Sequence, residues 1–226
     1  MKPKHLALAI FIIGLATPNL VYVISAVNDW VPSCVPYLEG CTSISRAARR
    51  GYSIFIFRAL MIVHATMLIC YWYVCAHWLQ TLHKRGLTSI NWMMWLGITG
   101  ALFLALYANY LGASGEVYRY LRRYGIVLFF GLTPLAQLLM INSLYKLSQH
   151  CGVAASFRFW LRIKLGLLSL MLMIAIGSLL QQYLGYSSFE RENIVEWNIG
   201  LLLMCFYYAS YRIWHNYTME FVVTNE

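Results

Sequence analysis

Six long apolar runs, joined by short connections, occupy most of the 226-residue chain. Each run has at least the ~20 apolar residues that an α-helix needs to cross a bilayer core. The runs are apolar on all sides, whereas a soluble helix of that length carries a polar face. The pattern predicts an all-α, polytopic membrane protein with a single transmembrane domain over residues 1–226. Its six transmembrane helices are expected at residues 6–27, 54–79, 92–111, 125–147, 159–180 and 194–213.

The first of these runs follows Lys2 and Lys4, as the apolar core of a signal peptide follows a basic start. Its length, and the Pro18-Asn19 pair near its end, favour a span that is retained over a segment that is cleaved.

The chain is 61% hydrophobic and 11% charged, with a formal net charge of +9. Its basic residues lie at the ends of the apolar runs and not on one soluble face, which argues against nucleic acid as a partner. All five lysines, Lys164 included, fall on one side of the predicted membrane, and six of the eight acidic residues fall on the other. This sorting predicts cytoplasmic termini and a non-cytoplasmic loop at residues 28–53.

Two of the six cysteines, Cys34 and Cys41, lie in this first loop. They form a disulfide if the loop faces an oxidising compartment, and otherwise both remain free thiols. The sequence leaves both alternatives open. It has no Cys-x-x-Cys motif and no histidine pair at the spacing of metal ligands, so neither a metal nor a cofactor is expected.

Polar residues inside the spans are costly and are therefore candidates for function. Arg58 and His64 lie six positions apart in the second run, so their side chains project about 240° apart around a helix. Arg58 is close enough to the span end to reach the headgroups, whereas His64 is deeper and serves either as a hydrogen-bonded interhelical residue or in proton transfer. Glu196 begins the sixth run, where the helix dipole favours a carboxylate. His64 and Glu196 are weak catalytic candidates, because no Gly-x-Ser-x-Gly motif accompanies them.

The segment Thr42-Ser-Ile-Ser-Arg-Ala, followed by Arg58 and by His64 six residues later, resembles the Frag/DRAM/Sfk family of six-span membrane proteins. Glu196-Trp197 is similar to a Glu-(Trp/Tyr) pair that opens the sixth span in that family. The resemblance follows nearly the whole chain in the order of its spans. Members remodel the lipid of GPI anchors, organise phosphoinositide enzymes at the plasma membrane, or modulate autophagy at lysosomes.

The resemblance is nearest to the members that remodel GPI anchors. It implies a multi-pass protein of the endoplasmic reticulum or Golgi membrane, with the plasma membrane and lysosome as alternatives, and a GPI or phospholipid as partner. The chain departs from the family pattern at positions where histidines are frequent. The nearest equivalents here are Arg122 or Arg123, Gln137 and Tyr207.

Two functions therefore compete. In the first, the protein handles a membrane lipid, and a rim of arginines faces the lipid phosphate, since guanidinium groups bind phosphate through two parallel hydrogen bonds. The rim is expected to consist of Arg46, Arg49, Arg50 and Arg58. His64 is expected to point towards a polar group of another span, and Glu196 to lie nearer Arg58 than His64. In the second, the protein is a non-enzymatic scaffold that positions another membrane protein through its cytoplasmic tail from His215 on. Whether it is an enzyme stays open, and a transporter is disfavoured because no row of polar groups lines several spans.

Overall fold

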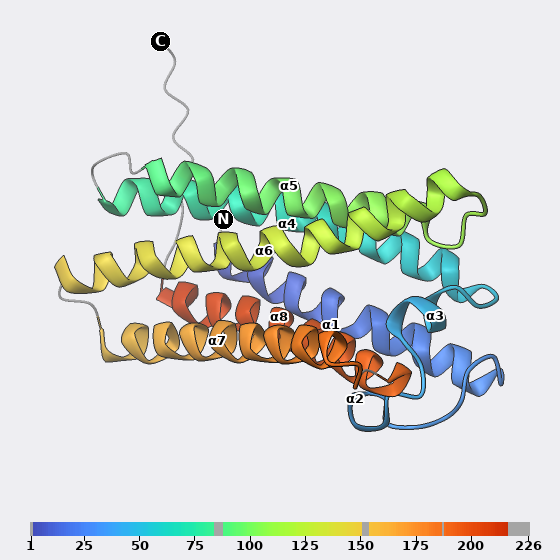
Figure 1. Cartoon of the computed structure of the whole chain (residues 1–226). Coiled ribbons are helices and arrows are strands. Elements are labelled where there is room, and N and C mark those ends of the chain that lie inside the picture. Colours follow the sequence, from blue (N-terminus) through green and yellow to red (C-terminus); the bar gives the residue numbers. More distant parts are fainter. Residues whose placement is uncertain (1, 84–87, 151–153, 187, 217–226) are drawn as a thin grey trace, which may run out of the picture.

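The computed structural model describes residues 2–83, 88–150, 154–186 and 188–216, and in these ranges all regular structure is helical (Figure 1). The all-α fold class is thereby confirmed. The elements are α1 (Pro3–Val27), α2 (Pro36–Glu39), α3 (Ile44–Ala48), α4 (Ser53–His83), α5 (Thr88–Tyr110), α6 (Glu116–His150), α7 (Ala155–Tyr183), α8 (Phe189–Ile213) and the short 3₁₀ helix η1 (Trp214–Asn216).

Five of these helices, namely α1, α4, α5, α6 and α7, are long and apolar enough to cross a membrane. The expected sixth span lies within α8, whose 25 residues would be long enough. Its sequence is less apolar, because it carries charged residues at both ends as well as several amides. The helices also extend beyond the predicted spans: α6 begins at Glu116, where the polar segment before the apolar run is already helical.

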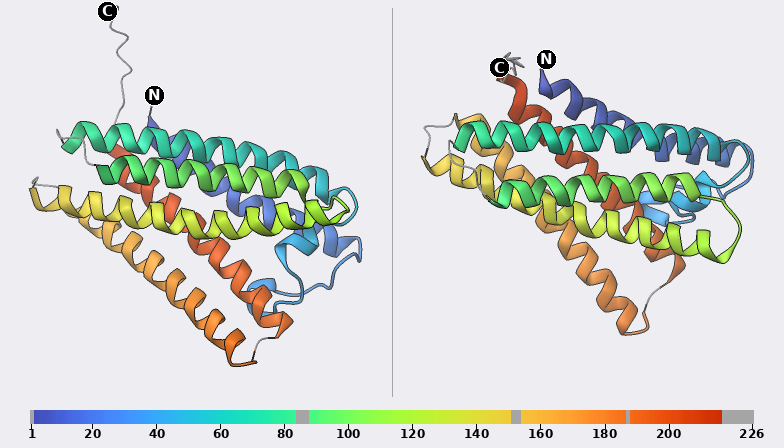
Figure 2. Two further views of the ribbon diagram at one scale, coloured as in Figure 1. Left: turned by 45° about the horizontal axis from the view of Figure 1, so that its top comes forward. Right: turned by 90° about the horizontal axis from the view of Figure 1, so that it is seen from above.

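The long helices run alternately up and down one bundle, so that the start of α1 and the end of α8 lie at the same end (Figure 2). The short helices α2 and α3 lie at the opposite end, here called the loop end (Figure 1). Helix α5 packs closely on both α4 and α6, which themselves touch each other little. Close approach of α4 and α5 requires Gly97, because a Cβ there would lie 2.2 Å from the Trp72 ring. Helix α7 packs mainly on α8 and touches α6 much less.

The first loop is closed by a disulfide between Cys34 and Cys41, whose Cα atoms are 6.5 Å apart. Within it, Tyr37 pairs with Asn19 of α1, and the Asn19 amide nitrogen lies 2.9 Å from the phenol oxygen. Burial raises the pKa of the Tyr37 phenol, which therefore stays protonated and able to donate.

The loop is bound to α8 through its own backbone carbonyl groups. Asn193 donates to the carbonyl of Gly40 at 2.7 Å, the Trp197 indole to Thr42 at 2.9 Å, and the Asn198 amide to Tyr37 at 2.9 Å. Because buried carbonyl groups need donors, these three side chains fix the loop, and with it α3, against the first turns of α8.

Candidate functional site

Four arginines surround a cavity of about 360 Å³ at the loop end. Arg46 belongs to α3, Arg49 and Arg50 follow it directly, and Arg122 comes from α6. The remaining lining residues are Gly112 and Ala113, so among the described residues no acidic side chain lines the cavity. We refer to it as the arginine pocket. Sequence reasoning named its first three arginines as headgroup-binding residues, but it did not assign Arg122 to them.

The arginines of this pocket are held in place by uncharged partners. The Arg122 guanidinium donates to the backbone carbonyls of Tyr110, at 3.2 Å, and Ala113. Nε of Arg49 donates to the carbonyl of Ser45 at 2.9 Å, and the Arg46 guanidinium lies 4.1 Å from the centre of the Phe189 ring. These contacts use only some of the donors of Arg46, Arg49 and Arg122, and the remaining donors can bind an anion.

Arg58, the fourth residue expected at the phosphate-facing rim, does not line the arginine pocket. Its Nε and Nη2 atoms both donate to the carbonyl oxygen of Leu111, at the end of α5, with Nε at 3.1 Å. The last carbonyl groups of a helix lack partners within it, so a cation placed there is favoured. Arg58 thus ties α4 to the end of α5.

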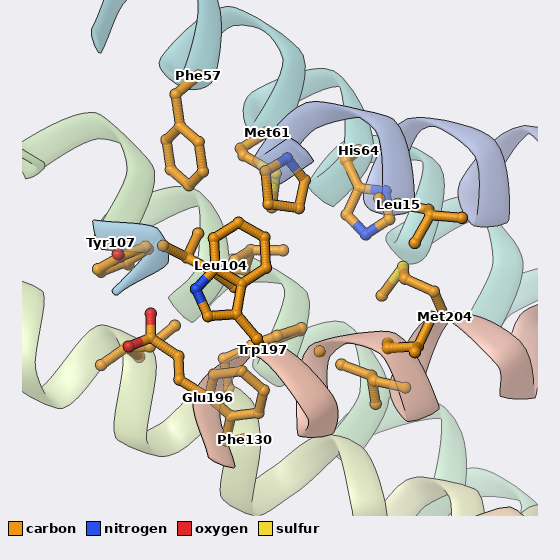
Figure 3. Close-up of a pocket in the computed structure, with 18 of the residues that line it drawn as sticks. Leu15, Phe57, Met61, His64, Leu104, Tyr107, Phe130, Glu196, Trp197 and Met204 are labelled. Atoms are coloured by element: carbon orange, nitrogen blue, oxygen red, sulfur yellow. The ribbon is translucent and has the colours of Figure 1, made fainter. Parts of the chain in front are cut away.

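His64 and Glu196 line a common cavity of about 70 Å³, here called the inner cavity (Figure 3). Its wall also contains Tyr107, Trp197 and Met204. In Figure 3 the carboxylate of Glu196 lies on the side of Tyr107, and the imidazole of His64 lies on the side of Met204. The two polar residues therefore approach one enclosed space from different helices, α8 and α4.

The His64 side chain is fully buried, and neither ring nitrogen has a hydrogen-bond partner among the described residues. Sequence reasoning expected it to point into the bundle towards a polar group of another span; it faces the inner cavity, whose wall includes Glu196 of α8, without a hydrogen bond to that residue. A buried nitrogen without a partner costs about 1–3 kcal/mol, so a group kept in this state is a candidate for binding something that donates or accepts there.

Glu196 lies against the start of α3. Its carboxylate interacts with the backbone amides of Ile44 and Ser45 and lies near Arg49. The first amides of a helix have no acceptor within it and favour an anion, so Glu196 holds α3 against α8. Glu196 lines the inner cavity together with His64, and Arg58 does not line it; the expected order of distances, nearer Arg58 than His64, stays a prediction.

A larger cavity of about 560 Å³, here called the outer cavity, lies between α6, α7 and α8. It shares Tyr107, Ile126, Phe130 and Glu196 with the inner cavity, so the two adjoin. Tyr107 is also within electrostatic range of Arg49 and Arg122. The arginine pocket and the two apolar cavities are therefore grouped around Tyr107 and Glu196.

A second polar cluster surrounds Lys164 of α7, which is completely buried. Its Nζ donates to the Ser210 hydroxyl at 2.6 Å and lies 3.4 Å from the centre of the Phe206 ring. The hydroxyls of Ser210 and Tyr71 are 2.6 Å apart, and the Tyr71 ring packs on Tyr207 at 5.0 Å. Sequence reasoning counted Lys164 among basic residues at the cytoplasmic span ends, and the structure places it inside the bundle. Its depth in the run, five residues past the predicted start, was the available signal.

No group of three or more histidine, cysteine, aspartate or glutamate side chains able to hold a metal ion occurs in the described ranges.

The fold and these cavities define a multi-pass, all-helical integral membrane protein with a polar site at one end of its bundle. Residues 4–212 match the family model described as the Frag1/DRAM/Sfk1/Cwh43P N-terminal domain, and the chain belongs to this family. The resemblance seen in the sequence is confirmed at the level of the family. No curated protein and no solved structure matches the chain.

Proposed function

We propose that the protein binds a membrane lipid that carries a phosphate in its headgroup, and that the arginine pocket is the headgroup site. The observation that carries the proposal is the convergence of Arg46, Arg49, Arg50 and Arg122 on one cavity without an acidic residue in its wall. Like charges repel one another, so this arrangement costs free energy that a bound anion offsets. The partner is therefore expected to be a dianionic or strongly anionic group such as a phosphate.

A lipid phosphate is favoured over a free phosphate ester by what lies next to the pocket. Ser45, which precedes Arg46, lines the apolar outer cavity, as does Tyr107. The cationic and the apolar surfaces thus meet within a few residues. A phospholipid likewise carries its charged headgroup next to its apolar chains, so that one molecule can contact both surfaces.

Within this proposal, the finer function is lipid remodelling, with the GPI anchor as the lipid that the sequence resemblance implies. His64 and Glu196 are the candidates for chemistry, since both line the inner cavity and the His64 nitrogens are without partners. The corresponding location is the endoplasmic reticulum or Golgi membrane. The alternative, a scaffold without enzymatic activity, relies on the tail after His215, of which residues 217–226 lie outside the described ranges.

Lipid binding in nanodiscs tests the proposal. Full-length protein is titrated with phosphatidic acid, phosphatidylinositol or phosphatidylcholine, and bound lipid is counted by native mass spectrometry. We expect a preference for the anionic lipids that falls about tenfold in Arg49→Gln/Arg122→Gln, since a hydrogen bond to a charged group contributes about 1.5–3 kcal/mol. Soluble glycerol phosphate is added as a competitor, to separate a lipid site from a site for free phosphate esters.

The matched control, which also removes two positive charges, is Arg119→Gln/Arg123→Gln, because neither of these arginines lines the arginine pocket. Arg119 is also an arginine of α6, but it pairs with Glu116 at 3.1 Å on the surface and does not line the arginine pocket. An equal loss of lipid binding in the test variant and the control would show that net charge, and not the arginine pocket, causes the loss. That result would contradict the proposal. Full competition by glycerol phosphate at equal concentration would show a free phosphate ester to be the ligand.

A further inference from the structure

The outer cavity is apolar over most of its wall. Its lining from α6 and α7 includes Phe130, Pro134, Leu138, Met171 and Leu172. Its volume of about 560 Å³ falls within the range of roughly 300–1,000 Å³ that is typical of small-molecule sites. Side chains normally fill the space between packed helices, so a gap of this size leaves room for another apolar molecule.

The outer cavity is open towards the bilayer side of the bundle. Three leucines that line it are substantially exposed: Leu135 at 51%, Leu138 at 47% and Leu172 at 41%. They come from α6 and α7, which touch each other little and diverge towards the loop end (Figure 2). An apolar molecule dissolved in the membrane therefore reaches the cavity sideways, between α6 and α7, without passing through water.

The polar groups of the outer cavity are gathered among the residues nearest the loop end. They are Ser45 and Tyr107, together with Glu192 and Glu196 of the first turns of α8. Ser45 is adjacent to Arg46, and Tyr107 lies within electrostatic range of Arg49 and Arg122. The wall thus changes from apolar, among the leucines, to polar, next to the arginine pocket.

We propose that the outer cavity holds one acyl chain of the phosphate-bearing lipid, which enters from the bilayer between α6 and α7. The inference rests on the proposed function, because the arginine pocket fixes which end of the lipid lies at the polar wall. The headgroup linkage then lies beside Ser45 and Tyr107, and the chain extends along Pro134, Leu138 and Met171. The inner cavity, at about 70 Å³, is too small for a chain.

Two glycines offer a matched pair of variants. Gly131 lines the outer cavity, and no atom lies within 4 Å of a Cβ added there. Gly177 of α7 has the same open surroundings, but it does not line the outer cavity. A Cβ meets no atom at either position, and of the two only position 131 lines the outer cavity, so Gly131→Trp is the blocking variant and Gly177→Trp its control. Ala175→Phe, which fills the cavity from α7, is the second blocking variant.

The experiment uses the full chain in nanodiscs with a phosphatidic acid that carries a diazirine in the middle of one acyl chain. After irradiation, labelled peptides are mapped by mass spectrometry. We expect labels concentrated on the cavity-lining parts of α6 and α7, and a fall of about tenfold in Gly131→Trp and Ala175→Phe, because the introduced ring occupies the space of the chain. The Gly177→Trp variant should be labelled at the same positions and to the same extent as the wild type.

Labels spread evenly over the exposed apolar face of α7, or equal labelling in Gly131→Trp and Gly177→Trp, would overturn the inference. Headgroup binding is read separately through Arg49→Gln/Arg122→Gln. If labels are spread evenly but lipid binding still depends on Arg49 and Arg122, only the proposed acyl-chain site is wrong. If labels are confined to the outer cavity but binding does not depend on these arginines, only the proposed headgroup site is wrong.

Discussion

Gly14 of α1 lies directly against the imidazole of His64 of α4. A Cβ at position 14 would be 2.7 Å from Cε1 of His64 and 2.0 Å from the sulfur of Met204. The absence of a side chain in α1 therefore creates the room in which the buried histidine sits. The contact joins three helices at the wall of the inner cavity, since Met204 belongs to α8.

Replacing Gly14 with alanine should destabilise the protein. Met204 is flexible and can move, but the His64 ring is enclosed, so the expected loss is about 1–3 kcal/mol, as for other overpacked cores. The measurement is the thermal midpoint in detergent, monitored by the exposure of cysteines. Gly166→Ala is the control, because a Cβ there has nothing within 4 Å; a stable Gly14→Ala protein would show that the ring shifts freely.

If the protein remodels a lipid as proposed, His64→Ala should abolish that activity and leave the protein folded. Neither ring nitrogen has a partner in the described structure, so the substitution breaks no hydrogen bond, and its cost is that of a cavity. Complementation of a remodelling-deficient cell line, with the steady-state amount of the variant protein as the folding check, measures both effects. A scaffold gives the reverse pattern: it tolerates His64→Ala and fails when residues 217–226 are removed.

Lys164 and Ser210 should respond asymmetrically to substitution. Lys164→Met replaces a buried charged side chain with an apolar one of similar shape. The free energy of unfolding is expected to stay the same or to increase. Ser210→Ala leaves the ammonium without its hydroxyl partner at 2.6 Å, at an expected cost of about 1–3 kcal/mol. The free energy of unfolding of both single variants and of the double variant measures the coupling. If Ser210→Ala costs nothing even with Lys164 present, the hydrogen bond does not stabilise the bundle.

Reduction of the Cys34–Cys41 disulfide should loosen the first loop. The bridge encloses six residues, so chain entropy alone predicts about 2 kcal/mol. The loop is also held by Asn193, Trp197 and Asn198, and we therefore expect local opening without loss of the bundle. Hydrogen exchange of residues 34–41 with and without a reductant checks this. An unchanged exchange rate would contradict the prediction.

The sequence predicted the helices well and the contacts between them poorly. Apolar runs locate the helices, because a helix that crosses a bilayer must be long and apolar. Arg46, Arg49 and Arg50 could be grouped from the sequence because they are neighbours along the chain. Arg122 joins them from more than 70 residues away. Helical spacing gives the direction of a side chain on its own helix, but it does not say which helix it faces. For the same reason, the contact of Arg58 with the Leu111 carbonyl could not be predicted from its position, and the depth of Lys164 in its run indicates burial but not its partners Ser210 and Phe206.

The polar residues of α8 have a further consequence, for the order in which the bundle assembles. Asn193, Trp197 and Asn198 point their donors at the first loop, and α8 is flanked by α1 and α7. A helix whose side-chain donors bond to neighbouring backbone is less favoured in contact with lipid than the more apolar α1 or α7. Its position depends on surfaces that the earlier segments must already provide. We therefore expect α8 to be the last helix to settle during biogenesis, and its placement to complete the wall of both apolar cavities.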